Sequence, residues 1–313
     1  MANDKGTYTF KQLAAHVLEQ AGAPLTADAI WQEAVALGLD KRLRSVGKTP
    51  PATLYSDLHR DTQTGGSDFI RVGSRPRRYW LKARGTPLDQ LDVTAPTPKK
   101  AANLVERDLH PLLAWFADTQ MSGVLVQTIF HEKSKKKSFG EWVHPDLVGV
   151  LFPRRALDTD CALGLSAALA APLCRIYSFE LKLRVDFGNL REAFFQAVSN
   201  SSWANEGYLV AAEFDDSPEF LDELERLCAA FRIGIIELSP QDPLSADTLI
   251  PATARPELDW ATIDKLAEMN PDFARFIKNV SDDLKTDIHP KEYDSVPEDV
   301  VQYVQGITSK IKG

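Results

Sequence analysis

The feature that most constrains the fold is a run at residues 175–184, RIYSFELKLR, which is apolar enough for an interior strand yet carries charged residues. Side chains alternate between the two faces of a strand, so Phe179, Leu181 and Leu183 point to one face. Glu180 and Lys182 therefore emerge together on the other face. A surface ion pair on an edge strand is the alternative, and the apolar neighbours disfavour it.

A second apolar run, residues 142–151, carries one acid near its start, Asp146, directly after Pro145. Two carboxylates and a lysine on neighbouring strands can bind a divalent cation and activate a water molecule. In this hypothesis Asp146 and Glu180 are ligands of Mg²⁺ or Mn²⁺. Lys182 orients or deprotonates the water, or stabilises charge in the transition state. Alternatively, Asp146 only caps the turn after Pro145.

Residues 103–240 alternate between helical and strand-like patterns, which predicts an α/β domain with a mixed sheet flanked by helices. Strands are expected at residues 124–130, 142–151, 175–184, 207–212 and 233–238. Helices are expected between 104 and 116, 158 and 171, 189 and 205, and 218 and 231. A Pro-rich connector after residue 240 leads to a helical C-terminal extension, residues 241–313. Its segments at 260–269, 271–284 and 297–311 suggest packing or dimerisation.

The N-terminal residues show a different order of elements, with three helical patterns followed by a hairpin. The first opens with a Thr9–Gln12 capping box and has the apolar stripe Phe10, Leu13, Ala14, Val17 and Leu18. The second has the stripe Ile30, Trp31, Ala34, Val35 and Leu37, and the third begins near Thr49. Residues 69–72 and 79–81 form the hairpin. This order predicts a winged helix at residues 1–84, joined to the second domain by a linker at 85–102.

The charge distribution points to double-stranded DNA as the partner of this first domain. The whole chain carries −8, but Lys41 to Arg84 holds eleven Lys and Arg against three Asp, so this segment is +8 and the remainder −16. Such asymmetry suggests contact with a polyanion. A protein-binding winged helix with a solvated basic wing is the alternative. The residues expected to contact DNA, on the third helix and the wing, are Lys48, Thr53, Tyr55, Arg60, Arg71, Arg75, Arg77 and Arg78, with Lys82 and Arg84 adding to the basic wing.

Several short segments of the first domain resemble the HARE-HTH family of winged helices. They are Tyr8-Thr9-Phe10, Ala23-Pro24-Leu25-Thr26, Ile30-Trp31, Thr53-Leu54-Tyr55 and Tyr79-Trp80-Leu81, within about residues 7–84. Members of this family are found fused to restriction-type nucleases and chromatin proteins. The resemblance therefore implies a DNA-reading module.

In the second domain, Pro145-Asp146 followed by Glu180-Leu181-Lys182, with Glu106 upstream, resembles the PD-(D/E)XK nuclease superfamily. Together with a HARE-HTH module, this is similar to the HrgA-type proteins. The resemblance implies a restriction-endonuclease-like core at residues 103–240. It also adds Glu106 and Gln196 as candidate catalytic residues. Alternatively, Glu106 only favours a helix N-terminus, and Gln196 is an exposed helix residue.

The expected function is a Mg²⁺- or Mn²⁺-dependent DNA endonuclease of restriction or phage-defence type, targeted by a winged helix that could sense modified bases. A non-catalytic DNA-binding regulator and an RNA-acting nuclease are the alternatives. A homodimer would supply the two active sites that double-strand cleavage needs. His144 and the lysines Lys133, Lys135, Lys136 and Lys137 are weaker candidates for phosphate contacts. No apolar run is long enough to span a membrane, and three unpaired cysteines, expected in the core, fit the cytoplasm.

Overall fold

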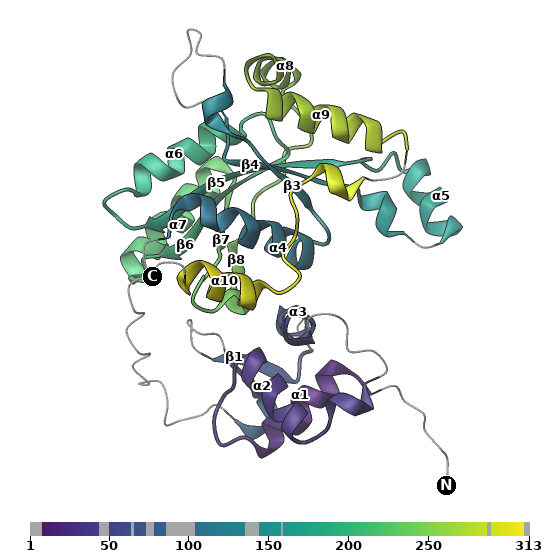
Figure 1. Ribbon diagram of the computed structural model, residues 1–313, viewed down its shortest axis with the longest axis vertical. Helices are drawn as coiled ribbons and strands as arrows, with labels where there is room; N and C mark the ends of the chain where they lie inside the picture. Colours follow the sequence, from purple (N-terminus) through teal and green to yellow (C-terminus); the bar gives the residue numbers. More distant parts are fainter. Residues whose placement is uncertain are drawn as a thin grey trace. The chain divides into compact units, whose positions relative to one another are not determined.

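The computed structural model describes residues 8–43, 50–63, 66–72, 78–85, 104–134, 144–157, 159–286 and 289–309. The chain folds into two compact units, drawn in Figure 1. The first comprises Met1–Ala102, Gln241–Ser245 and Glu298–Gly313, and the second comprises Asn103–Pro240 and Ala246–Pro297. The second unit therefore continues well beyond residue 240.

The first unit contains the predicted three helices and hairpin: α1 (Phe10–Gln20), α2 (Ala27–Ala36), α3 (Pro50–Gln63), β1 (Phe69–Val72) and β2 (Arg78–Leu81). The predicted capping box is present, since the Thr9 side chain accepts from Gln12 N–H and the Gln12 side chain accepts from Thr9 N–H. The hairpin is antiparallel, and Leu25 forms an isolated bridge with Tyr79. Helix α10 (Val300–Ser309) also belongs to this unit.

The apolar stripe of α1 is buried as predicted, whereas that of α2 was only partly right. Ile30 and Ala34 are fully buried, but Val35 and Leu37 are 47% and 48% exposed. The contact stripe of α2 follows the spacing Ala27, Ile30 and Ala34, so residues 35 and 37 fall outside it. Hydrophobicity was mistaken here for burial.

The second unit is built on a six-stranded sheet with the order β3-β4-β5-β6-β7-β8. Strands β5, β6 and β7 run parallel to one another, and the remaining pairs are antiparallel. The mixed sheet was predicted, but β8 was not. The strands are β3 (Leu125–Thr128), β4 (Leu147–Leu151), β5 (Arg175–Val185), β6 (Glu206–Phe214), β7 (Ile233–Glu237) and β8 (Asp247–Ile250).

The helices of this unit are α4 (His110–Gln120), α5 (Asp160–Ala168), α6 (Leu190–Ser201), α7 (Pro218–Phe231), α8 (Trp260–Met269) and α9 (Pro271–Asp283). Helices α6 and α7 form the two crossovers between parallel strands. Their apolar faces share one buried cluster with Leu209 and Ile235 of the sheet. Helices α8 and α9 bury Phe273 and Phe276 against Val148 of β4 and Trp203.

The strand register fixes which helices lie on the face that carries Glu180. Val148 of β4 lies opposite Ser178, and Glu180 lies opposite Leu209, so all four side chains share one face. Since Val148 packs with α9 and Leu209 packs with α6, both helices cover this face. Helix α6 comes especially close, because a Cβ at Gly207 would lie 2.2 Å from the Ser201 side chain.

Candidate active site

The pair Glu180 and Lys182 lies in the middle of the sheet, on β5. Lys182 Nζ donates to Glu180 Oε1 at 2.9 Å, and the Glu180 side chain is almost fully buried. Strand β5 has β4 on one side and β6 on the other. The alternative of a surface ion pair on an edge strand is therefore excluded.

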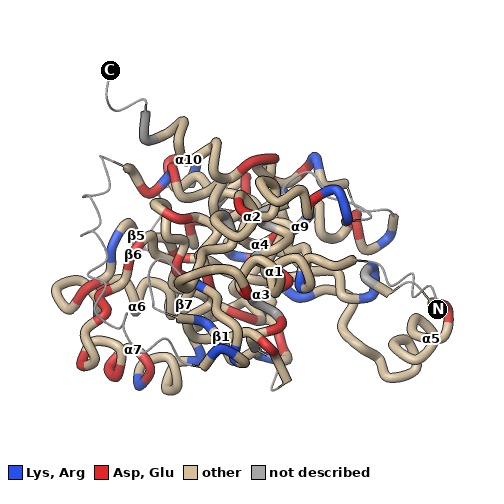
Figure 2. Tube along the Cα trace, turned by 90° about the horizontal axis from the view of Figure 1, so that it is seen from below, with Lys and Arg blue, Asp and Glu red and all other residues tan. Residues whose placement is uncertain are grey.

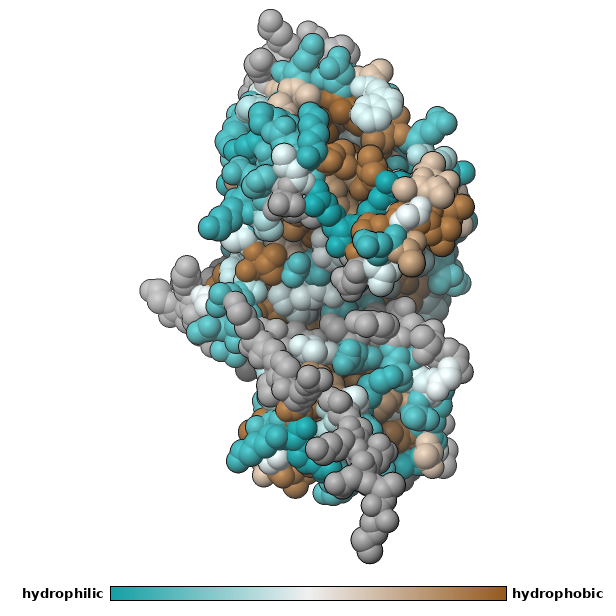
Figure 3. Space-filling view, turned by 90° about the vertical axis from the view of Figure 1, so that its right-hand side faces the viewer, coloured by the Kyte–Doolittle hydropathy of each residue, from teal (hydrophilic) through white to brown (hydrophobic). Residues whose placement is uncertain are grey.

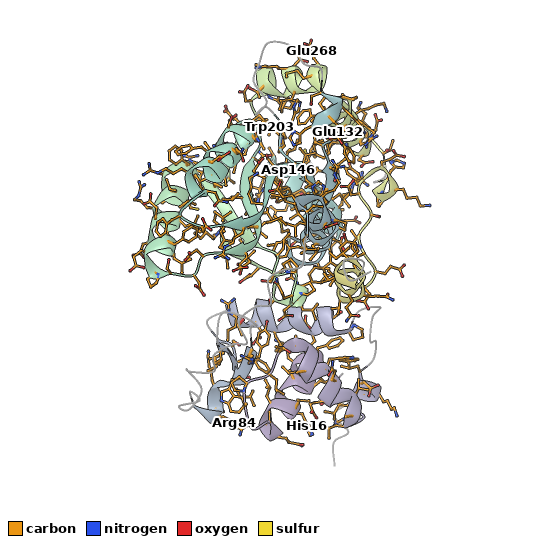
Figure 4. All side chains as sticks on the ribbon, turned by 60° about the vertical axis from the view of Figure 1, so that its left-hand side comes forward. His16, Arg84, Glu132, Asp146, Trp203 and Glu268 are labelled. Atoms are coloured by element: carbon orange, nitrogen blue, oxygen red, sulfur yellow. The ribbon has the colours of Figure 1, made fainter. Side chains whose placement is uncertain are left out.

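Asp146 lies directly before β4 and reaches across to β5. Its Oδ2 accepts from the backbone N–H of Leu181 at 2.7 Å, and its Oδ1 lies 3.1 Å from Nε2 of His131. The Leu181 bond places this carboxylate beside the backbone between Glu180 and Lys182. Asp146 thus serves the neighbouring strand rather than its own turn, and Figure 4 shows it inside the second unit.

Helix α6 contributes Asn200, which sequence reasoning missed. Its Nδ2 donates to Glu180 Oε2 at 2.9 Å, while its backbone oxygen accepts from the Ser178 hydroxyl and from Trp203 Nε1. Glu180 is therefore held at both carboxylate oxygens. The only sequence signal was an amide residue one helical turn after Gln196, too weak to single out.

Gln196 lies on α6 at four residues from Asn200, and its side-chain oxygen is buried without a hydrogen-bond partner. The same is true of the side-chain oxygen of Asn200. Buried acceptors without a donor are costly, so both oxygens can accept from a bound group. The side chain of Gln196 is partly buried rather than fully exposed.

Glu106 lies in a 3₁₀ turn, η3 (Glu106–Leu109), directly before α4. Burial raises its pKa, and the charge of Asp146 adds to this, whereas Lys182 and a hydrogen bond from the Leu183 backbone oppose it. These influences place Glu106 in the same electrostatic neighbourhood as the β5 pair. The predicted helix break at Pro111 corresponds to the restart from η3 into α4.

The charges in the site determine the protonation state of its groups. Burial and then the neighbouring Asp146 raise the pKa of Glu180. Burial also acts to raise the pKa of Asp146, but hydrogen bonds from His131 and Leu181 lower it overall. Burial alone would lower the pKa of Lys182, yet Glu180 reverses this, so its pKa is raised and the side chain stays cationic.

The donor set fits a hard divalent cation within limits. Among the residues that the structure describes, no group of three or more His, Cys, Asp and Glu side chains could hold a metal ion. Asp146 and Glu180 are two facing carboxylates, and Mg²⁺ commonly takes one or two carboxylates while keeping several waters. A cation between them would also relieve the repulsion that raises the pKa of Glu180.

His131 is the other residue that the sequence did not reveal, and the C-terminal half of the unit sets its position. It lies in η4 (His131–Lys133), and the Asp146 carboxylate raises its pKa. Asn270 donates to Phe130 O and to Ser134 Oγ, at 3.0 and 2.9 Å. These contacts fix the residues on either side of η4.

Of the weaker phosphate-contact candidates, two have structural partners. Lys133 Nζ pairs with the buried Asp272 at 3.0 Å, and it lies over the ring of Phe130. His144 is buried, with its Nε2 3.3 Å from the backbone oxygen of Leu266, and burial lowers its pKa. Both side chains therefore stabilise the fold. Lys135, Lys136 and Lys137 lie outside the described residues.

The candidate DNA surface of the first unit is described in part. Figure 2 shows Lys and Arg residues around β1. Arg71 on β1 is exposed, Arg78 on β2 is partly buried, and Thr53 is partly buried on α3. Tyr55 and Arg60 also lie on α3, whereas Lys48, Arg75 and Arg77 lie outside the described residues.

Not every basic residue of this hairpin region faces a ligand. Arg84 Nη1 donates to the backbone oxygens of Leu18 and Ala21, and its guanidinium lies 4.2 Å from the ring centroid of Trp80. It thus closes the C-terminal end of α1, whose carbonyl groups have no helical partner. The net charge of the segment overstates its DNA-binding residues to this extent.

Three helices followed by an antiparallel hairpin define the first unit as a winged helix-turn-helix domain. Residues 8–81 match the family model HARE-HTH, whose description names ASXL and a restriction endonuclease HTH domain. The chain therefore carries a HARE-HTH domain, a DNA-binding winged helix. No curated protein and no solved structure matches the chain. None of the described helices is long and apolar enough to cross a membrane.

Proposed function

We propose that this protein is a metal-dependent DNA endonuclease of restriction or phage-defence type, directed to its substrate by the HARE-HTH domain. The observation that carries the proposal is the meeting of Asp146 and Glu180 with Lys182 at adjacent strands. Asp146 is bonded to Leu181, the residue between the other two. A DNA-binding module in the same chain supplies a matching substrate.

The chain's own groups divide the work of phosphodiester hydrolysis. A divalent cation held by Asp146 and Glu180 supplies Lewis acidity for the scissile phosphate and acidifies a water molecule. Lys182, whose raised pKa keeps it protonated, stabilises negative charge on the phosphate rather than removing a proton. Asn200 holds the Glu180 carboxylate in a fixed orientation. Glu106 is the remaining carboxylate near enough to accept a proton.

Plasmid cleavage tests the proposal directly. Purified protein is incubated with Mg²⁺ or Mn²⁺ and plasmids that are unmodified, methylated or hydroxymethylated, since restriction systems discriminate by base modification. Nicking or linearisation of at least one substrate is expected, with a loss of about 100-fold or more for Glu180→Gln and Lys182→Ala. The matched control is Glu223→Gln, an exposed carboxylate on α7 paired with Arg226. Equal activity of Glu180→Gln and Glu223→Gln would refute the site.

A DNA-binding regulator with a non-catalytic second unit is the competing function, and one observation favours it. The Asp146 and Glu180 oxygens already have protein partners, and the described residues contain no group of three metal ligands. Calorimetric titration with Mn²⁺ separates the two functions. The endonuclease predicts binding that Asp146→Asn abolishes. The regulator predicts salt-sensitive DNA binding with no metal dependence.

A further inference from the structure

Helix α5 is hydrophobic but buries none of its residues. It lies between β4 and β5, and residues 161–173 contain no charged side chain. Soluble proteins seldom expose a continuous apolar helix unless it serves an interaction. Figure 3 shows hydrophobic residues gathered on the side of the molecule where Figure 1 draws α5. The leucines concerned are Leu163, Leu165, Leu169 and Leu173, which are 38%, 60%, 71% and 53% exposed.

This helix is nevertheless held firmly in place. Its C-terminal end is closed by backbone bonds from Ala171 N to Ser166 O and from Ala170 N to Ala167 O, the pattern of a Schellman motif. Arg154 Nη2 donates to the backbone oxygens of Ser166 and Ala171. A helix this short is marginal without tertiary packing, so a rigidly displayed apolar surface implies that another surface covers it.

We propose that the α5 surface, meaning α5 with Leu169 and Leu173, is the contact between two copies of this chain. Charge is the first reason. Outside the basic segment from Lys41 to Arg84 the chain carries −16, so two copies repel each other over most of their surface. The α5 surface brings no like charges together, because residues 161–173 carry none.

Symmetry is the second reason for choosing a second copy as the occupant. In a two-fold dimer the same surface patch meets itself, so the patch has to be self-complementary. Large side chains at residues 163, 165 and 169 alternate with small ones at Gly164, Ala167 and Ala168. Leucines of one helix can therefore pack against the small residues of the other. A charged partner, such as DNA, would find no matching group here.

The size of the surface sets the expected strength. One short helix and its flanking leucines lie at the low end of specific interfaces, which bury about 800 Å² per partner in the standard case. The dimer should therefore dissociate in the micromolar range. It would bring two copies of the Asp146–Glu180 site into one assembly, but it forms whether or not that site is catalytic.

Sedimentation velocity of the full chain, from about 1 to about 100 µM, brackets that range and tests the proposal. A monomer–dimer equilibrium is expected for the unmodified protein. Leu165→Glu with Leu169→Glu should raise the dissociation constant at least tenfold, since each dimer would bury four carboxylates. Both leucines are largely exposed, so the melting temperature should not change. The control is Leu221→Glu, a partly exposed leucine on α7 that should leave the dimer intact.

Chemical crosslinking gives an independent readout through Cys161, which is exposed at the start of α5. A bifunctional maleimide should yield crosslinked dimers that Cys161→Ala abolishes. A protein that stays monomeric throughout the concentration range overturns the proposal. So does a dimer that survives the double substitution, or one that the control also disrupts. Flotation with lipid vesicles by a monomeric protein would show that a membrane covers α5 instead.

Discussion

Asn270 should be one of the most sensitive positions in the protein, although nothing in its sequence context suggests it. Its side chain is fully buried and makes four hydrogen bonds. The Oδ1 atom caps α9 by accepting from the backbone N–H groups of Asp272 and Phe273, at 2.8 and 3.2 Å. The Nδ2 atom holds Phe130 O and Ser134 Oγ, which flank η4. One amide thus joins α9 to the segment that carries His131.

The cost of Asn270→Ala follows from these contacts. Loss of a helix cap costs about 1 kcal/mol. Two further hydrogen bonds contribute about 1 kcal/mol each, and burial of the abandoned acceptors adds to this. A loss of about 3 kcal/mol in the unfolding free energy is expected. For a unit of this size it lowers the melting temperature by roughly 6 to 12 °C. Asn270→Ser keeps the cap and loses the two bonds across to η4, so it should cost about 2 kcal/mol.

The neighbouring helix provides the matched control. Asp259 caps α8 by accepting from the backbone N–H and the hydroxyl of Thr262, both within the first turn of that helix. Its replacement by Ala should cost about 1 kcal/mol. Differential scanning calorimetry of the full chain would follow the transition of the second unit. Equal losses for Asn270→Ala and Asp259→Ala would refute the reasoning, because they would show that the bonds to Phe130 and Ser134 contribute nothing.

Three further predictions concern the same unit. Thr128→Val should cost about 1 to 3 kcal/mol in urea unfolding, since the Thr128 hydroxyl donates to Asp294 Oδ2 at 2.6 Å and Val cannot; a loss below about 0.5 kcal/mol would contradict this. Burial lowers the pKa of His110 in the folded state, so the unfolded chain protonates first as pH falls below about 6.5. Stability relative to His110→Asn should therefore decline from pH 7 to 5, and a pH-independent difference would argue against this. If the proposed function holds, Asn200→Ala should weaken Mn²⁺ binding about tenfold, because it frees a carboxylate that must be held in place to bind the ion, with little change in melting temperature compared with Asn270→Ala.

Elements with a clear period were predictable from the sequence, because their burial is encoded locally. The Thr9 capping box and the alternation that puts Glu180 beside Lys182 each span only a few residues. Strand β8 was missed because it is short and follows a Pro-rich segment. Cys161 was expected in the core but is exposed, since an apolar helix was taken for a buried one. The pattern gives hydrophobicity, and only the tertiary fold decides what covers it.

The site shows the same division between local and distant information. Glu180 and Lys182 are found by a spacing of two, and Asp146 by its place at the start of an apolar run. Asn200 and His131 have no such signal, because each becomes relevant only through the fold. Contacts made by Asn270 then connect η4 to a helix about 140 residues further along the chain. The structure also settled the charge of Lys182, which the sequence left open, because the balance between burial and Glu180 depends on a distance. A site identified from motif spacing alone therefore names its charged groups but omits those that orient them.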